Sequence, residues 1–132
     1  MKREIIDLTK EDLKLIEEAK KIINKTHFRN KGIISDVVSI IITEKGNIFY
    51  GVDIEGLAPG SGVCAETSAI TNMIIARKAN EKIKTCLALY GDPRYKKKIY
   101  QILPPCHKCR KNLRRFGKPW AFISETKKER LK

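Results

Sequence analysis

The amino-acid sequence predicts an α/β fold, and three observations support this class. Apolar residues recur at helical spacing over residues 10–24. Two β-rich runs, joined by a glycine-containing turn at Glu44–Asn47, predict a β-hairpin over residues 36–54. The apolar run "IKTCLALYG" is typical of a buried strand. With the later elements, the order α-β-β-α-β-α-β indicates a sheet covered by helices.

The first helix also carries a start signal, because Thr9 can act as an N-cap and acidic residues follow it. After the hairpin, "EGLAPGSG" has the composition of a loop. A second helix is expected from Cys64 to about Asn80, where apolar residues again have helical spacing. One predicted helix thus precedes the hairpin in the sequence, and the other follows it.

The last third of the chain predicts three more segments. Residues 92–105 form a polar, basic connector that ends in prolines. A short helix is expected from Cys106 to Phe116, with Gly117 as its C-cap. The run "PWAFIS" then predicts a final strand.

Length and composition fit one soluble globular domain spanning residues 1–132. The chain is 42% hydrophobic and 33% charged, and no apolar run approaches the ~20 residues that cross a bilayer. The first twenty residues interleave acids with bases and have no apolar signal-peptide core. We therefore expect a cytoplasmic protein without a membrane partner.

The net charge of +13 is concentrated in the second half of the chain. Residues 1–63 hold ten basic and ten acidic side chains, whereas residues 94–118 hold ten bases and no acid. One interpretation is a solvated face that keeps the protein soluble. The other is a surface that attracts a phosphate-bearing partner.

Three of the four cysteines have the spacing of metal ligands. Cys106 and Cys109 lie three residues apart, so both thiols can face the same way on one helical turn, and Cys64 opens the helix before them. Cys86 sits within an apolar strand, the position of a small core residue. Three thiolates with an open fourth position indicate a catalytic zinc site. A redox Cys-x-x-Cys pair is the rival hypothesis, but it leaves Cys64 without a role.

Glu66 follows Cys64 by two residues, so it can lie beside a metal without ligating it. A carboxylate in that position can act as a general acid/base on a metal-activated water. The alternative is a surface glutamate that stabilises a helix N-terminus.

The motifs "CAE" and "PCHKC" together resemble those of the zinc-dependent cytidine deaminase superfamily, in its cytidine and blasticidin-S deaminase-like branch. The stretch "GVDIEG" at residues 51–56 precedes "CAE" with the family's spacing, and the resemblance covers residues 35–123. It implies a three-layer α/β/α domain with a central mixed sheet and a Zn²⁺ cofactor. It also implies hydrolysis of the 4-amino group of a cytosine nucleoside.

The resemblance assigns roles residue by residue. It implies that Cys64, Cys106 and Cys109 bind the zinc and that Glu66 is catalytic. It places Asp53, Glu55 and Ala65 at the nucleoside substrate. It further implies a homo-oligomer, a tetramer in which neighbouring chains complete each pocket.

Several positions depart from the family pattern. An aromatic residue of the family falls on Ser35, an asparagine on Asp53, another asparagine on Gly56, and an arginine on Thr67. Three thiolates leave a zinc cluster with net negative charge, which a nearby cation would offset. Arg110, directly after Cys109, is the candidate for that electrostatic support.

Three other functions remain open at this point. The altered position 53 favours a deaminase of aminonucleoside antibiotics of the blasticidin S type. The basic stretch at residues 94–118 favours a nucleotide or RNA cytosine deaminase, although few aromatic residues are available to stack a strand. A zinc-stabilised binding module without activity is the third, and it would have no use for Glu66.

Overall fold

The computed structural model describes residues 3–56, 60–94, 99–117, 120–123 and 127–131. The elements are, in chain order, β1 (Arg3–Asp7), α1 (Lys10–Thr26), β2 (Phe28–Asn30), β3 (Ile33–Ser35), β4 (Val37–Thr43), β5 (Ile48–Val52), α2 (Ala65–Ile75), β6 (Ile83–Asp92), β7 (Ile99–Ile102), α3 (His107–Arg114), β8 (Trp120–Ile123) and β9 (Lys127–Leu131).

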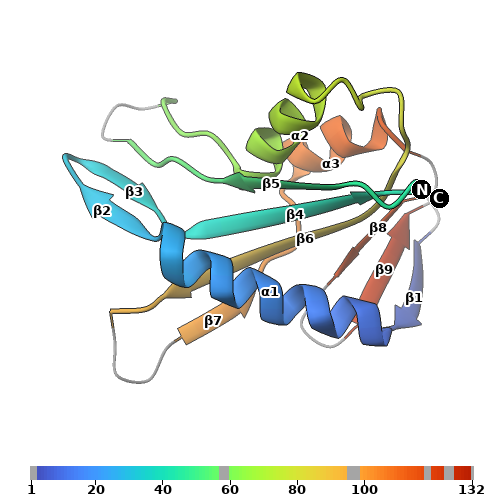
Figure 1. Ribbon diagram of the computed structural model, residues 1–132, viewed down its shortest axis with the longest axis horizontal. Helices are drawn as coiled ribbons and strands as arrows, with labels where there is room; N and C mark the ends of the chain where they lie inside the picture. Colours follow the sequence, from blue (N-terminus) through green and yellow to red (C-terminus); the bar gives the residue numbers. More distant parts are fainter. Residues whose placement is uncertain (1–2, 57–59, 95–98, 118–119, 124–126, 132) are drawn as a thin grey trace.

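The central sheet is mixed, and over the described residues it has seven strands. The strands lie in the order β1-β9-β8-β6-β4-β5, and β7 pairs with β6 beside this path. Only the β6–β8 pair among these described strands is parallel. Because β4 pairs with one edge of β6, both β7 and β8 pair with its other edge. The hairpin of β2 and β3 forms a separate small sheet (Figure 1).

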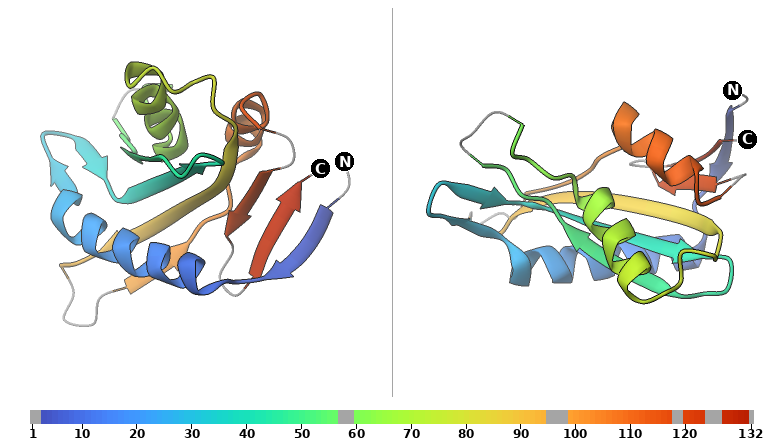
Figure 2. Two further views of the ribbon diagram at one scale, coloured as in Figure 1. Left: turned by 45° about the vertical axis from the view of Figure 1, so that its right-hand side comes forward. Right: turned by 90° about the horizontal axis from the view of Figure 1, so that it is seen from above.

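The molecule has three layers, because α1 covers one face of the sheet while α2 and α3 cover the other (Figures 1 and 2). Side-chain alternation explains why. On β4, Ile40 packs with the residues of α1, whereas the next residue, Ile41, packs with α2 and α3. On β6, Leu87 and Cys86 divide in the same way. The predicted three-layer α/β/α fold with a mixed sheet is confirmed.

Helix α1 begins with a capping box. The Asp12 backbone N–H donates to Thr9 Oγ1 at 3.1 Å, and the Thr9 backbone N–H donates to Asp12 Oδ2 at 3.0 Å. The second Asp12 oxygen accepts from Lys128 Nζ at 3.2 Å, and both side chains are nearly buried. Asp12 thus joins the start of α1 to β9, near the other end of the chain.

Asp12→Ala is expected to lower the free energy of unfolding by about 3 kcal/mol, because it removes the cap and leaves the Lys128 ammonium without its partner. Chemical denaturation measures this effect. Glu17→Gln is the matched control, since it breaks the exposed Lys20–Glu17 pair and should cost less than about 0.5 kcal/mol. Equal losses in the two variants would contradict the role given to Asp12.

Gly51 on β5 lies unusually close to α2. A Cβ atom at this position would come within 3.0 Å of backbone atoms of Ala65, Ser68 and Ala69. Only glycine lets the strand and the first turn of the helix approach this closely. The N-terminal end of α2 therefore lies in direct backbone contact with β5.

The predicted helices and the hairpin are present, with corrections at their ends. Thr9 is the N-cap of α1, and the β4–β5 turn lies at Glu44–Asn47 as expected. The second helix is shorter than predicted, because it ends at Ile75 and Arg77 has a positive φ of 59°. The predicted element order was incomplete, since β1, β2, β3, β7 and β9 were not expected. In particular, the connector before the prolines contains β7.

The prediction that Gly117 is the C-cap of the third helix is wrong. Helix α3 ends at Arg114, and Arg115 is its C-cap. Gly117 instead passes against β6, where an added Cβ would meet the Ile83 backbone. The Ile83 N–H donates to the Phe116 carbonyl at 2.9 Å, which holds this crossing in place.

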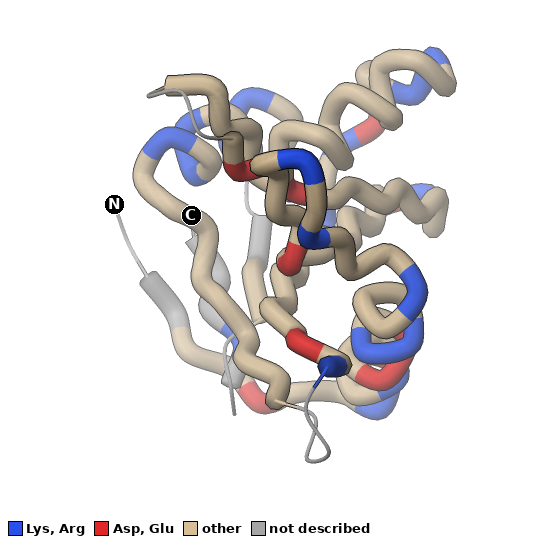
Figure 3. Tube along the Cα trace, turned by 90° about the vertical axis from the view of Figure 1, so that its left-hand side faces the viewer, with Lys and Arg blue, Asp and Glu red and all other residues tan. Residues whose placement is uncertain are grey.

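Lys and Arg are spread over many separate segments of the trace, with Asp and Glu among them (Figure 3). Of the basic stretch 94–118, Lys96, Lys97, Lys98 and Lys118 lie outside the described residues. Among the helices described, none is long and apolar enough to cross a membrane.

Candidate metal centre and active site

The three predicted cysteines meet where α2 and α3 begin. Cys64 is the N-cap of α2, Cys106 is the N-cap of α3, and Cys109 lies in the first turn of α3. Their sulfur atoms all lie within 4.8 Å of one another. Cys109 is fully buried, Cys64 is half-buried and Cys106 is exposed. Residues 42 positions apart in the sequence are thus brought into one cluster.

The cluster fits a zinc ion. A tetrahedral site with Zn–S bonds of ~2.3 Å holds its sulfurs about 3.8 Å apart, which the observed spacing allows. Two of the three thiols lie at helix N-termini, where the helix dipole favours a negative charge. Three thiolates occupy three of four positions and leave one for water or substrate.

Local hydrogen bonds already favour a thiolate at one of the three positions. Burial would raise the pKa of Cys106, but it is outweighed by hydrogen bonds from the Cys109 backbone and the Cys109 and Cys64 thiols, and the pKa is lowered. Burial raises the pKa of Cys64 and that of Cys109, where the charge of Glu66 adds to the effect. Without a metal, therefore, the negative charge is favoured at Cys106.

Glu66 lies beside the cluster and is only 6% exposed. Burial raises the pKa of its carboxyl, while a hydrogen bond with Cys109 opposes the increase. A surface glutamate would show neither effect, so that alternative is wrong. The raised pKa and the contact with a cluster thiol are what a proton-transferring carboxyl needs.

Of the three residues expected at the substrate, Ala65 and Asp53 lie beside the cluster. Ala65, the first residue of α2, is buried. Asp53 is 6% exposed, and its Oδ1 accepts the backbone N–H groups of Asp36 and Val37, each at 2.9 Å. Glu55 is exposed, and its backbone pairs with Ile34 on β3. The structure brings Asp53 and Glu66 close enough that the Asp53 charge also raises the pKa of Glu66.

The structure adds Asp36, which the sequence did not single out. Asp36 stands between β3 and β4, and a carboxylate oxygen of Asp36, Asp53 and Glu55 can all lie within 4.8 Å of one another. We call these three residues the acidic triad. The only sequence signal was an aspartate directly after Ser35, at the start of the first hairpin strand.

Arg110 packs under the segment that carries Cys106. Its Nε donates to the Pro105 carbonyl at 3.0 Å, and its guanidinium lies 5.0 Å from the centre of the Phe122 ring. These contacts fix a cation one residue from Cys109. Electrostatic support of the thiolates by Arg110 stays a prediction.

Cys86 and Thr67 complete the surroundings. Cys86 is 1% exposed, packs in the core between the sheet and the helices α2 and α3, and lies 3.8 Å from Ser39 Oγ. It is a core residue, as its apolar neighbours in the sequence predicted. Thr67, where the family pattern has an arginine, lies with its hydroxyl 3.9 Å from Cys109 Sγ.

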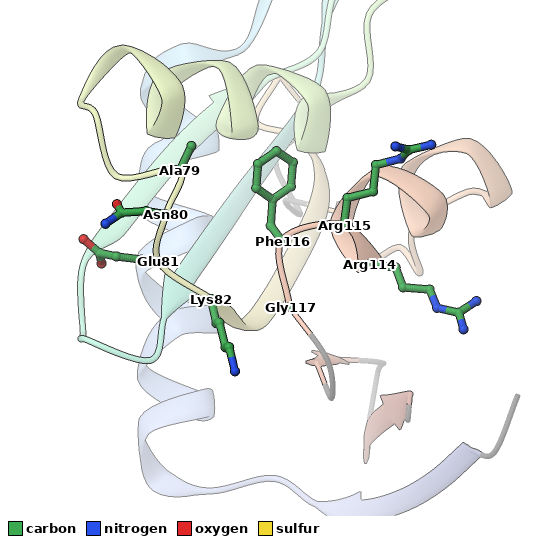
Figure 4. A pocket seen from close by; sticks show the side chains of 8 residues that line it. All are labelled: Ala79, Asn80, Glu81, Lys82, Arg114, Arg115, Phe116 and Gly117. Carbon is green, nitrogen blue, oxygen red and sulfur yellow. The ribbon is translucent and has the colours of Figure 1, made fainter.

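A separate hollow of about 450 Å³ lies by the C-terminal end of α3 (Figure 4). Lys82, Arg114 and Arg115 line it, but their charged groups point in different directions. Glu81, also in the lining, is held by Thr43 and Asn47, whose hydrogen bonds lower its pKa. The basic side chains do not converge there on one ligand.

A three-layer α/β/α domain that gathers three thiols between two helix starts has the donor set of a metal-binding domain. Residues 9–124 match the family model of the cytidine and deoxycytidylate deaminase zinc-binding region. The chain belongs to this deaminase family, and zinc is the cofactor that the family and the cysteine cluster indicate.

Solved structures share this fold. The cytidine deaminase from Burkholderia pseudomallei superposes with a TM-score of 0.65 at 20% identity, over 92% of this chain and 91% of that one. The cytidine deaminase from Bacillus anthracis gives a TM-score of 0.65 at 19% identity, over 85% and 74% of the two chains. The enzyme from Mycobacterium leprae gives a TM-score of 0.62 at 17% identity, over 84% and 86%. The predicted family and fold are thereby confirmed.

Proposed function

We propose that this chain is a zinc-dependent hydrolytic deaminase of a cytosine nucleoside, namely cytidine, deoxycytidine or a close analogue. It would replace the 4-amino group by a carbonyl and release ammonia. The observation that carries the proposal is the buried carboxyl of Glu66, in contact with a thiol of the three-cysteine cluster.

In this proposal Cys64, Cys106 and Cys109 hold the zinc. When bound, zinc supplies the acidity that makes a water molecule a nucleophile at neutral pH. The cluster lies between two helix starts, so the backbone N–H groups there stabilise the negative charge of the thiolates. The buried position of Cys109 keeps bulk water away from one side of the site.

Glu66 carries the protons. Its carboxylate takes a proton from the attacking water and delivers it to ring nitrogen N3 of the cytosine. It then takes the proton of the new C4 hydroxyl group and passes it to the departing amino group, so that C4 becomes a carbonyl, the C4–N bond breaks and ammonia leaves. One water molecule is consumed, and the product is the uracil nucleoside.

Asp53, Glu55 and Ala65 are proposed to hold the nucleoside. Carboxylates accept hydrogen bonds from sugar hydroxyls, although Asp53 cannot also donate as an asparagine would. Asp53 Oδ1 is already used by two backbone N–H groups, so its orientation is fixed before any substrate binds.

The test is a panel of cytidine, deoxycytidine, their monophosphates, blasticidin S and a short cytosine-containing RNA. We expect the zinc-loaded protein to release ammonia from a nucleoside, to lose this activity when a chelator removes the metal, and to regain it with zinc. Preference for a monophosphate or the RNA would instead support the alternative based on residues 94–118. No release of ammonia from any compound would contradict the proposed function.

The homotetramer and the cytoplasmic location stay predictions. Helix α2 leaves Ile74 and Ile75 52% and 73% exposed, so apolar surface is available for a second copy of the chain at the end of α2 away from the cluster.

A further inference from the structure

Helix α2 reaches across to the buried thiol of the three-cysteine cluster. Cys109 belongs to α3, yet two side chains of α2 contact it. The Glu66 carboxyl shares a hydrogen bond with the Cys109 thiol, and the hydroxyl oxygen of Thr67 lies 3.9 Å from Cys109 Sγ. Glu66 has a role in the proposed function, but Thr67 does not.

The hydroxyl of Thr67 is directed differently from that of the next threonine along α2. Thr71 Oγ1 donates to the Thr67 carbonyl at 2.9 Å, which is the local bond that a threonine within a helix commonly makes with the preceding turn. Thr67 lies in the first turn of α2, and its hydroxyl faces Cys109 on the neighbouring helix. One hydroxyl therefore serves the metal cluster, whereas the other serves its own helix.

The chemistry of metal binding decides which of the two groups donates the hydrogen bond. Zinc binds cysteine as a thiolate, which has no proton to give, so the Thr67 O–H is the donor and Cys109 Sγ is the acceptor. Glu66 cannot replace this donor, because its carboxyl gains and loses a proton during the proposed reaction. The Thr67 hydroxyl can stabilise the thiolate in both states of Glu66.

The nearby cation is held in another direction. Arg110 Nε donates to the Pro105 carbonyl at 3.0 Å, and the guanidinium lies 5.0 Å from the centre of the Phe122 ring. Within the part of the chain that the structure describes, Arg110 has no hydrogen bond to a cluster sulfur. Its charge can act only across a distance, so the direct donor to Cys109 comes from α2.

We propose that Thr67 is a positioning residue of the metal centre, which donates a hydrogen bond to the Cys109 thiolate and lowers the electron density that this ligand gives to zinc. Three thiolates leave the cluster with a net negative charge, which weakens the metal as a Lewis acid. A hydrogen bond to one ligand offsets part of this charge and fixes the orientation of the ligand. The inference rests on the proposed function for its effect on the rate, but not for its effect on the metal.

The first experiment measures zinc affinity by competition with a chelator. Thr67→Val removes the hydroxyl at nearly constant shape, and we expect it to bind zinc about tenfold more weakly, as is typical when an outer partner of a metal ligand is lost. Thr67→Ser keeps the hydroxyl and should restore the affinity. Thr71→Val is the matched control, because it removes the same group from the same helix, and it should bind zinc as the wild type does. Wild-type affinity in Thr67→Val, or an equal loss in Thr71→Val, would overturn the inference.

The absorption spectrum of the cobalt-substituted protein distinguishes this hydrogen bond from a role in packing alone. A thiolate that loses a hydrogen bond gives its electrons to the metal more easily, so the sulfur-to-cobalt charge-transfer band of Thr67→Val should move to longer wavelength. Thr67→Ser and Thr71→Val should leave the band in place. An unchanged band in Thr67→Val would overturn the inference, because altered packing by itself does not change the electronic state of the thiolate.

Turnover separates this inference from the proposed function. With the best substrate of the panel, zinc-saturated Thr67→Val should lose about tenfold in kcat while KM changes little, since Thr67 acts through a metal ligand rather than on the substrate. Weaker zinc binding and a shifted band without deamination of any compound would retain the inference and reject the proposed function. Deamination, together with wild-type zinc affinity and an unshifted band in Thr67→Val, would retain the function and reject the inference.

Discussion

Glu66→Gln is expected to lower the rate of deamination by about 10²–10⁴-fold, the contribution typical of a general acid/base. Glutamine has nearly the same shape as glutamate, but its amide cannot take a proton from water and return it to the substrate. The structure makes this a clean test, because Glu66 is buried beside the thiol cluster and a substitution of equal size disturbs the packing least. The measurement is single-turnover deamination by the zinc-loaded variant.

Two controls belong to that experiment. The variant should keep its zinc and its unfolding midpoint, since Glu66 is not among the three residues of the metal cluster. Asp53→Asn tests whether the loss of any carboxylate near the site lowers the rate to the same extent. We expect this variant to change KM more than kcat. Turnover of Glu66→Gln at the wild-type rate would show that another group carries the proton.

The second large effect is a loss of zinc affinity, which we expect when any of the three clustered thiols is removed. Cys64→Ser, Cys106→Ser and Cys109→Ser should each weaken zinc binding by more than about 100-fold, because even loss of an outer partner of a ligand costs 10–100-fold. Zinc content after gel filtration measures this, and cobalt substitution reports the number of thiolate ligands. The activity should fall together with the metal.

Cys86→Ser is the matched control, since it makes the same chemical change at a cysteine outside the cluster, 23 residues before Cys109 in the chain. Its thiol lies in the apolar core, so the variant should lose some stability but keep its zinc. The ligand assignment would be refuted if Cys86→Ser lost the metal while Cys64→Ser retained it.

The sequence was a good guide where local pattern decides the structure. Thr9 and the apolar spacing after it defined α1, and the "CAE" and "PCHKC" motifs located the cluster. Within each motif the residues are close together in the chain, where helix geometry brings side chains to one face, and the family resemblance linked the two motifs across 42 residues. The layered fold followed from the order of these elements.

The edge strands could not be predicted in this way. β1 and β9 are rich in charged residues, and they pair from Arg3↔Leu131 to Asp7↔Lys127, across almost the whole chain. Their structure depends on a partner strand rather than on their own pattern. β7 is similar, because its structure depends on antiparallel pairing with β6.

The acidic triad was missed for a related reason. Asp36 is 17 residues from Asp53, and only the register of β4 against β5 and the bridge from Ile34 to Glu55 bring the carboxylates together. A pattern of residue types cannot supply that register. The charge pattern of the chain as a whole allowed either a solvated basic face or a phosphate-bearing partner, and neither interpretation locates these carboxylates.

The close approach at Gly51 has a consequence for anyone who wishes to redesign this protein. Because a β-carbon there would collide with the first turns of α2, the distance from the sheet to Cys64 and Glu66 is set by the absence of a single methyl group. Libraries that vary a residue proposed to hold the substrate, such as Glu55, leave that distance unchanged, since its side chain does not set it. Position 51 should remain glycine in every member, because a larger residue would move Cys64 and Glu66 together.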